Sequence, residues 1–195
     1  MILAFLQGLR DSGRIQPGQK VLIYGASGGV GTFAVQLAKA FGAEVTAVCS
    51  TKKVEMVRSL GADHVIDYTQ EDFTQNGQQY DLILVVNGHR SLADYKRALN
   101  PKGIYVMAGG STKQLFQTLL FSSFMSEKGG KRMGYLAAKP NQSDLLFLNE
   151  LLETRQVVPV VERCYPIGET AEAIRYVEAG HARGKVVIVM EEDKS

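Results

Sequence analysis

The chain has 195 residues, with 22 Lys and Arg against 20 Asp and Glu and a net charge of +2. This balance argues against a protein that wraps a polyanion, because nucleic-acid binding usually needs a basic face. Apolar residues make up 45% of the chain and charged residues 22%, which is typical of a folded globular protein. No apolar run reaches the roughly 18 residues that a membrane helix needs, and the start lacks the pattern of a signal peptide. We therefore expect neither nucleic acid nor membrane as a partner.

Short apolar runs alternate with helical periodicity along most of the chain. Strands are expected at residues 20–24, 45–49, 64–67, 82–86, 104–108 and 132–138. Helices are expected at residues 30–41, 54–60, 92–99, 112–124 and 143–154. Repeated strand-helix units build a parallel sheet with helices on both faces. The pattern therefore predicts an α/β fold with a doubly wound parallel sheet (Rossmann type) of about six strands.

The pattern changes near residue 157. Residues 157–161 and 185–190 are predicted strands, and they flank one predicted helix at residues 169–179. This β-α-β pattern predicts a small unit of its own, so we divide the chain into residues 1–156 and a tail of residues 157–195.

The cysteines and histidines do not form a metal-binding pattern. Cys49 and Cys164 are too few for a disulfide framework or for a zinc site of four cysteines. His64, His89 and His181 lie far apart and lack metal-ligand spacing. We therefore expect no bound metal. The low cysteine content favours a reducing compartment, and we expect a cytoplasmic location.

A glycine-rich turn, Gly25-Ala-Ser-Gly-Gly-Val-Gly31, joins the first predicted strand to the first predicted helix. It fits the dinucleotide fingerprint G-x-G-x-x-G with Ala26 at the first position. In that fingerprint Gly28 lets a pyrophosphate approach the backbone, and Gly31 lets the helix pack against the strand. The helix N-terminus also directs free N–H groups at a phosphate. The turn therefore predicts a dinucleotide site.

The second predicted strand ends without the acidic residue of an NAD-selective site. Such a site places Asp or Glu about 20 residues after the glycines, where it binds the ribose 2′-hydroxyl. Here the strand ends in Cys49-Ser-Thr-Lys-Lys53, and Glu55 already lies inside the following helix. Hydroxyl groups and two lysines instead offer hydrogen-bond donors and positive charge to a 2′-phosphate. NADP(H) is therefore the expected cofactor.

The same glycines also fit the short-chain dehydrogenase turn, G-x-x-x-G-x-G. Such a reductase needs Tyr-x-x-x-Lys on a long helix, where the lysine lowers the tyrosine pKa for general acid catalysis. Tyr135 and Lys139 have that spacing, and Ser122 or Ser123 lies upstream. Glycines before this stretch and Pro140 after it predict a loop and a strand there, not a long helix. This disfavours the short-chain hypothesis, which we keep as an alternative to the interpretation that follows.

The chain resembles the zinc-free quinone-oxidoreductase branch of the medium-chain dehydrogenase/reductase family from end to end. The motifs that match in order and spacing are Leu6-Gln-Gly-Leu-Arg10, Pro17-Gly-Gln-Lys-Val-Leu-Ile23, the glycine-rich turn, Gln36-Leu-Ala-Lys39, Leu60-Gly-Ala-Asp63, Val65-Ile-Asp-Tyr68, Leu99-Asn-Pro-Lys-Gly103 and Gly180-His-Ala-Arg-Gly-Lys-Val-Val187. The resemblance implies an NADPH-dependent oxidoreductase that reduces a small quinone, enone or aldehyde by hydride transfer from the nicotinamide, without zinc. The protein then mostly orients the pair, and we name no catalytic residue.

The resemblance also implies where the cofactor binds. The pyrophosphate would lie on Ser27, Gly28, Gly29 and Val30, next to Gly31. Ser50 and Lys53 would face the 2′-phosphate, and Tyr68 would line the adenosine end. Two loops would flank the nicotinamide ribose: Asn87, Gly88 and His89 after the fourth strand, and Ala108, Gly109, Gly110 and Ser111 after the fifth.

The sequence departs from this family at its start. Relatives begin with a β-rich substrate domain of about a hundred residues, and Met1 falls where that domain would already have ended. The tail resembles the segment that completes this domain in relatives. We therefore expect a fragment that binds cofactor, and keep a non-catalytic NADPH-binding module as a further alternative. The edge strand at residues 132–138, through which family members often pair, favours a homodimer.

Overall fold

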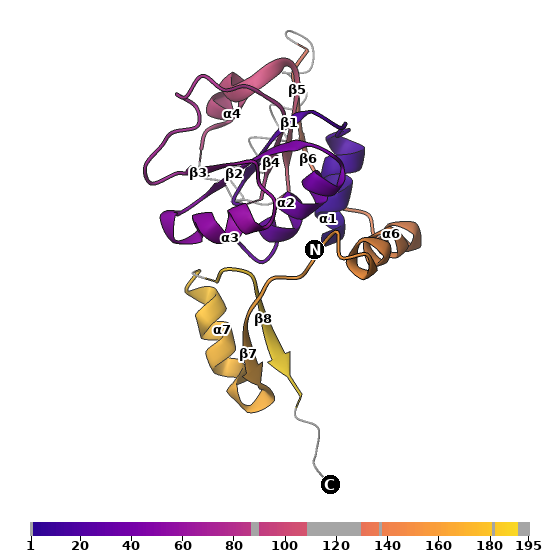
Figure 1. Cartoon of the computed structure of the whole chain (residues 1–195), viewed down its shortest axis with the longest axis vertical. Coiled ribbons are helices and arrows are strands. Elements are labelled where there is room, and N and C mark those ends of the chain that lie inside the picture. The colour runs from indigo at the N-terminus through magenta and orange to yellow at the C-terminus, as the bar shows by residue number, and fades with distance from the viewer. Residues whose placement is uncertain (1, 87–89, 109–129, 137, 181, 191–195) are drawn as a thin grey trace.

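The computed structural model describes residues 2–86, 90–108, 130–136, 138–180 and 182–190. Six parallel strands form one sheet in the order β3-β2-β1-β4-β5-β6 (Figure 1). They are β1 (Lys20–Tyr24), β2 (Glu44–Cys49), β3 (His64–Asp67), β4 (Tyr80–Val85), β5 (Leu99–Met107) and β6 (Arg132–Tyr135). From β1 the strand order continues through β2 to β3 on one side and through β4 and β5 to β6 on the other. This is the doubly wound order, so the predicted fold class is confirmed.

Helices flank the sheet on both faces (Figure 1). One face carries α2 (Gly31–Ala40) and α3 (Val54–Ser59), together with α1 (Ile2–Gln7), its π-helical extension (Gly8–Ser12) and α6 (Gln142–Glu153). The other face carries α4 (Leu92–Ala98), which begins with a capping box between Ser91 and Asp94. Within the described residues, no helix has the length and apolar character needed to cross a membrane.

The central strands are apolar throughout because both of their faces are covered. The side chains of Val21, Leu22, Ile23, Leu82, Ile83 and Leu84 are fully buried. Alternate residues point to opposite faces, so Val21 and Ile23 pack on the α2 side whereas Leu22 packs on the α4 side. In the observed register Tyr24, the last residue of β1, lies beside Val48 of β2 and Val85 of β4, so the glycine-rich turn leaves the sheet at the carboxyl ends of these strands.

An aromatic cluster fills the α4 side of the sheet. Tyr24 meets the rings of Phe73 and Tyr95 edge-on, with centroids 5.7 and 5.8 Å apart. Tyr105 adds a fourth ring 5.2 Å from Tyr95. Such pairs stabilise a core beyond the area that they bury. The cluster holds Tyr24, the last residue of β1, at the carboxyl end of the sheet.

A buried carboxylate joins the two ends of the first unit. Asp144, at the start of α6, accepts hydrogen bonds from Gln7 Nε2, Arg10 Nη2 and Asn141 Nδ2, each at 2.7 Å. The side-chain amide of Gln7 also makes two hydrogen bonds with the backbone of Lys139: its Nε2 donates to the carbonyl oxygen, and its Oε1 accepts from the N–H. Asp144 is only 3% exposed, so these donors replace the water that a buried charge loses.

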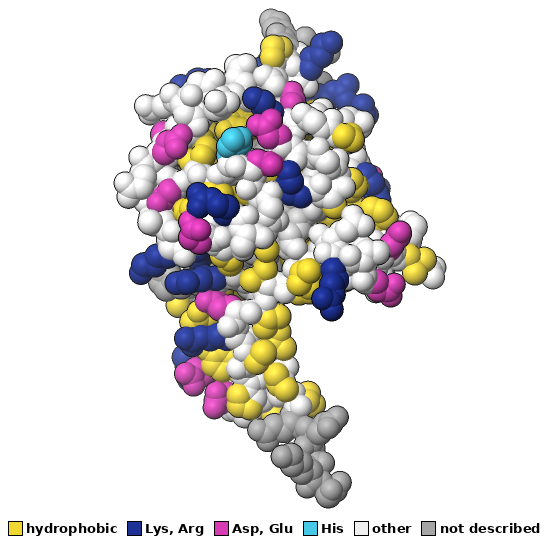
Figure 2. Space-filling view, in the orientation of Figure 1, with side chains coloured by type: hydrophobic (Ala, Val, Ile, Leu, Met, Phe, Trp, Pro, Cys, Tyr) yellow, Lys and Arg dark blue, Asp and Glu magenta, His cyan; other side chains and the backbone are white. Residues whose placement is uncertain are grey.

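The tail contains the predicted β-α-β pattern, but its first strand is shifted. Instead of residues 157–161, the strand is β7 (Val161–Pro166), which pairs in parallel with β8 (Lys185–Val189). A 3-10 turn (Ile167–Glu169) and α7 (Thr170–Glu178) connect them. Figure 1 shows this unit beyond the helices of the α2 side, and Figure 2 shows hydrophobic side chains along it.

The shift of the tail strand has a local cause. Val158 donates its N–H to Gln36 Oε1 at 2.8 Å, and its carbonyl accepts from Gln36 Nε2 at 3.0 Å. Val157 donates to the Leu151 carbonyl at 3.1 Å, and Pro159 has no N–H. The backbone groups that a strand would need are therefore used to fasten this segment to α2 and α6.

The sixth strand ends at Tyr135 rather than residue 138, because Tyr135 pairs with Met107 and the partner strand β5 ends there. The helix expected at residues 112–124 lies outside the described residues.

Asp144 makes folding depend on pH. The hydrogen bond from Gln7, with those from Arg10 and Asn141, outweighs burial and lowers the pKa of Asp144 below its ordinary value. A group whose pKa is lower in the folded state stabilises the fold above its unfolded pKa of about 4, and this contribution is lost as pH falls through the folded value. We expect Asp144→Asn to lower the free energy of unfolding at pH 7 by about 2 kcal/mol, and to flatten its decline below about pH 4.

Urea unfolding across this pH range measures both effects. Asp11→Asn is the matched control, because Asp11 also pairs with Arg10 but lies half exposed. It should change the free energy of unfolding by less than about 1 kcal/mol. A pH profile for Asp144→Asn that is parallel to that of the unchanged chain would contradict the assignment.

Candidate functional site

A pocket of about 440 Å³ lies at the carboxyl ends of the central strands, and we call it the glycine-turn pocket. Its lining residues come from the ends of β1 to β4 and from the tail. They are Tyr24, Gly25, Ser27, Gly28, Gly29, Val30, Val48, Cys49, Ser50, Lys53, Tyr68, Val86, Gly180 and Ala182. In doubly wound sheets, ligands bind outside the carboxyl ends of the strands, where this pocket lies.

Most of the predicted site residues that the structure describes meet in this pocket. Ser27, Gly28, Gly29, Val30, Ser50, Lys53 and Tyr68 line it. Gly31 lies behind the turn and Ala108 at the end of β5, where its N–H donates to the Val85 carbonyl at 2.9 Å. Asn87, Gly88, His89, Gly109, Gly110 and Ser111 lie outside the described residues.

The glycine-rich turn depends on the absence of side chains at two positions. A methyl group at Gly31 would lie 2.1 Å from the carbonyl oxygen of Gly25, so helix and strand approach closely only without it. At Gly28 a methyl group would meet no atom within 4 Å and would project into the open pocket. Gly25 itself has φ +85°, a conformation that favours glycine. The expected packing role of Gly31 is therefore confirmed.

The N-terminus of α2 lies beside this open backbone. Its N-cap residue is Val30, whose apolar side chain gives the helix no capping hydrogen bond. The N–H groups of Thr32 and Phe33 in the first turn donate to the carbonyl oxygens of Gly28 and Val30, both at 3.1 Å. What this end of α2 offers to the pocket is therefore chiefly the positive end of the helix dipole. This end of α2 can in this way receive an anion from the pocket.

The turn after β2 places the side chains of the neighbouring Lys52 and Lys53 in different surroundings. Lys53 is partly buried and lines the pocket, where its Nζ donates to the carbonyl oxygen of Ala182 at 3.2 Å. Lys52 is exposed and is not among the lining residues. Ser50 lies between the end of β2 and the 3-10 turn (Thr51–Lys53). Among the described lining residues there is no Asp or Glu, so Lys53 gives this end of the pocket a positive charge.

Asp67, which precedes the lining residue Tyr68, is a carboxylate that already accepts hydrogen bonds from other donors. Asp67, the last residue of β3, accepts from the N–H and the hydroxyl of Thr69 at 3.0 and 2.8 Å. A hydrogen bond from Thr51 is the main cause that lowers its pKa. Tyr68 follows it with a half-exposed ring, and its N–H donates to the Cys49 carbonyl at 3.0 Å.

Cys49 is a residue of the pocket lining that is almost fully buried, and burial is the main cause that raises the pKa of its thiol to about 11. The thiol is therefore protonated at neutral pH and is not a nucleophile. Tyr24 and Val86 also line the wall. They are the residue before the glycine-rich turn and the residue after β4, so the rule that places ligands at strand ends could have found them. Gly180 and Ala182 carry no such signal, since only the folded tail brings them here.

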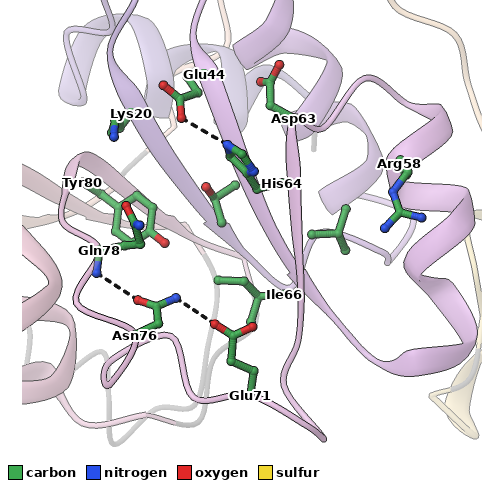
Figure 3. A pocket seen from close by; sticks show the side chains of 12 residues that line it. Lys20, Glu44, Arg58, Asp63, His64, Ile66, Glu71, Asn76, Gln78 and Tyr80 are labelled. Carbon is green, nitrogen blue, oxygen red and sulfur yellow. Dashed lines mark hydrogen bonds and ion pairs between the residues drawn. The ribbon is translucent and has the colours of Figure 1, made fainter.

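A second pocket, of about 490 Å³, lies at the opposite ends of the strands (Figure 3). Lys20, Glu44, His64 and Tyr80 begin β1, β2, β3 and β4 in that order, and all four line it. Polar side chains here partner one another: His64 Nε2 lies 3.2 Å from Glu44, and Asn76 joins Glu71 to the backbone of Gln78. This second pocket lies at the amino ends of the strands, whereas ligands of doubly wound sheets bind at the carboxyl ends. The glycine-turn pocket is therefore the candidate site.

The short-chain dehydrogenase alternative is wrong. Tyr135 ends strand β6 and Lys139 follows it without helical structure, with its backbone held by Gln7. A Tyr-x-x-x-Lys pair works by standing one helical turn apart, and these two residues do not share a helix. Ser122 and Ser123 lie outside the described residues. Elsewhere in the described chain, no group of three or more His, Cys, Asp or Glu is arranged to hold a metal ion.

Sheet order, flanking helices and glycine-rich turn define a doubly wound α/β protein of the Rossmann type. A family model described as zinc-binding dehydrogenase matches residues 60–188. The mouse protein named NAD(P)H oxidoreductase RTN4IP1, mitochondrial, is 37% identical, with 88% of this chain and 48% of that protein covered. Tomato 2-methylene-furan-3-one reductase is 34% identical over 93% of this chain and 43% of that protein. The chain belongs to the medium-chain dehydrogenase/reductase family, as the resemblance predicted.

A solved structure supports the same assignment. The quinone oxidoreductase from Coxiella burnetii has a TM-score of 0.79 at 27% identity, covering 95% of this chain and 57% of that chain. The chain spans about half the length of the relatives that it matches. The expectation of a cytoplasmic location is contradicted, because the mouse relative is named as mitochondrial. The cysteine count indicated only a reducing environment, which does not distinguish the two compartments.

The same substitution should destabilise the chain to very different extents at two glycines of the turn. Gly31→Ala places a methyl group 2.1 Å from a backbone oxygen that cannot move aside, so we expect a loss of at least about 3 kcal/mol in unfolding free energy. Gly28→Ala meets open space and should cost less than about 1 kcal/mol. Chemical denaturation of the two variants side by side measures this difference, and equal losses would show that the turn is not packed as described.

Proposed function

We propose that this chain is the cofactor-binding part of an NADPH-dependent oxidoreductase, and that NADP(H) binds in the glycine-turn pocket. The observation that carries the proposal is the convergence of an open glycine backbone, an uncapped helix N-terminus and Lys53 on one pocket without a described carboxylate in its lining. These are the groups that a pyrophosphate and a 2′-phosphate require.

The cofactor would bind along the pocket from the turn to β3. Ser27, Gly28, Gly29 and Val30 would hold the pyrophosphate, since Gly28 leaves the space that a side chain would fill. Ser50 and Lys53 would bind the 2′-phosphate, and the half-exposed ring of Tyr68 would flank the adenosine. When bound, NADPH supplies a hydride, and the chain's own residues position it.

The substrate side of the proposal rests on the relatives. One is named as a furanone reductase and one solved neighbour as a quinone oxidoreductase, which supports a small enone or quinone as hydride acceptor. We propose that the transfer needs no zinc from this chain, since its three histidines and two cysteines are widely separated in sequence. The name of the mouse relative supports a mitochondrial location.

The tail supports the proposed division into residues 1–156 and 157–195. Val161, Ile174, Val177 and Val189 expose between 44% and 53% of their surface, which is unusual for apolar side chains of a β-α-β unit. In the proposal these side chains complete a substrate domain with further sequence of the enzyme. Strand β6 lies at the edge of the sheet, and exposed edges pair readily, which supports a homodimer.

Cofactor preference is tested by calorimetric titration with NADPH and, separately, with NADH. We expect Lys53→Met to weaken NADPH binding roughly 10- to 100-fold, because a charge-assisted hydrogen bond is worth about 1.5–3 kcal/mol. NADH lacks the phosphate, so its affinity should change less than about threefold. Lys52→Met is the matched control, since Lys52 carries the same charge outside the pocket lining. Equal losses for both cofactors would contradict the role of Lys53, and binding of neither by the unchanged chain would contradict the proposal.

Turnover separates an enzyme from the non-catalytic NADPH-binding module. The unchanged chain is mixed with NADPH and a panel of quinones and enones, and NADPH oxidation is followed by absorbance. Oxidation that depends on both protein and acceptor is expected if the residues present suffice to orient the two. Tight NADPH binding without oxidation would favour the binding module for this chain alone.

A further inference from the structure

The tail forms one wall of the glycine-turn pocket. Ala182 accepts the hydrogen bond from Lys53 Nζ at 3.2 Å, although the two residues are 129 positions apart. A methyl group at Gly29 would lie 2.6 Å from the carbonyl oxygen of Gly184, so the tail backbone rests directly on the turn. Gly180 and Ala182 both line the pocket. The residues that would bind phosphate are thus in direct contact with the tail.

A carboxylate outside the pocket holds this part of the tail. Glu162, on β7, accepts the N–H of Arg183 at 2.7 Å through one oxygen and the hydroxyl of Tyr176 at 2.9 Å through the other. Glu162 is not among the residues that line the pocket. Its two bonds join β7, α7 and the segment of residues 182–184 that contacts the turn.

The same segment has little room to move. The N–H of Lys185 donates to the Val160 carbonyl at 2.6 Å. A methyl group at Gly184 would lie 2.5 Å from that carbonyl oxygen, and Gly184 has φ +154°. Because the chain is held by Glu162 at Arg183 and by Val160 at Gly184 and Lys185, the position of the adjoining Ala182 carbonyl is set by the tail and not by the pocket.

This carbonyl determines where the Lys53 ammonium lies. A lysine side chain has four rotatable bonds, and fixing them costs up to about 2 kcal/mol of conformational entropy. The ammonium has three N–H donors, so one bond to Ala182 leaves two for a phosphate. A lysine that is already oriented by the tail therefore loses less entropy when a 2′-phosphate binds.

We propose that Glu162 is a positioning residue for the selection of NADP(H) over NAD(H). By binding the N–H of Arg183 it holds the Ala182 carbonyl, which in turn holds Lys53 toward the 2′-phosphate. The inference rests on the proposed function, in which Lys53 meets that phosphate. It assigns a part in cofactor selection to a residue of the tail that is not among those lining the pocket.

Coupling follows from this arrangement. Phosphate binding and the ordering of the tail share the contact between Lys53 and Ala182, so each must favour the other by the same free energy. A bound 2′-phosphate should therefore hold the tail in place. NADPH should therefore slow hydrogen exchange of the backbone amides at residues 182–185. NADH, which lacks the phosphate, should slow it less.

The first test is titration calorimetry of Glu162→Ala with both cofactors. We expect the dissociation constant for NADPH to rise about three- to tenfold, the usual effect of losing one hydrogen bond, with NADH affinity within about twofold of the unchanged chain. Glu162→Gln keeps an oxygen that can accept from Arg183, so it should restore most of the NADPH affinity. Glu172→Gln, an exposed carboxylate on α7, is the matched control and should change neither constant.

A double substitution separates positioning from a general loss of structure. If Glu162 acts through Lys53, adding Glu162→Ala to Lys53→Met should produce no further loss of NADPH affinity. Equal weakening of NADPH and NADH by Glu162→Ala, or a full additional loss in the double variant, would overturn the inference. So would hydrogen exchange at residues 182–185 that NADPH and NADH slow equally in the unchanged chain.

The outcomes distinguish this inference from the proposal beneath it. An unchanged chain that binds NADPH selectively, with Glu162→Ala retaining full selectivity, overturns the role of Glu162 and leaves the proposed function intact. An unchanged chain that binds neither cofactor overturns the proposed function and this inference with it.

Discussion

The close approach of helix α2 to strand β1 is the constraint on which the rest of the site depends. Because Gly31 has no side chain, the helix starts almost in contact with the Gly25 carbonyl. That contact places the helix N-terminus at the carboxyl end of a strand buried on both faces, and it leaves Gly28 open to the pocket. A larger residue at position 31 would move the helix away, and the turn, the positive end of the helix dipole and the pocket would no longer coincide.

The central part of this arrangement could be predicted from the sequence, because it depends on residues that are close together in the sequence. The bounds of β1 and β3 and the place of the turn follow from apolar runs and glycines that act over a few residues. The predicted position of the tail strand is wrong because the buried side chain of Gln36 forms hydrogen bonds with the backbone of Val158. The sequence near residue 158 gives no sign of this contact. Nor could local spacing distinguish Lys53 from Lys52, since the distinction is made by the Ala182 carbonyl. The contribution of the tail to the pocket is of the same kind, because it depends on contacts across more than a hundred residues.

Backbone groups of the tail make several of its contacts with the sheet unit. Carbonyl and amide groups of Val158, Ala182 and Gly184 meet Gln36, Lys53 and Gly29, whereas the side chains of Val161, Ile174, Val177 and Val189 are about half exposed. Backbone groups are present whatever the side chain, so these attachments tolerate sequence change in the tail as long as its path is kept. One side of the tail can therefore keep its contacts with the proposed cofactor site. Its outer side chains can vary with the further sequence that is proposed to cover them.

The buried thiol of Cys49, a residue of the pocket lining, has a consequence for chemical damage. Enones are electrophiles that alkylate the ionised form of cysteine, and a protein proposed to handle them exposes itself to that reaction. Because burial raises the pKa of Cys49 to about 11, its thiol stays protonated at pH 7. Burial therefore protects the pocket from inactivation by the compounds that it is proposed to reduce, and sulfur can serve there as an inert, polarizable packing group.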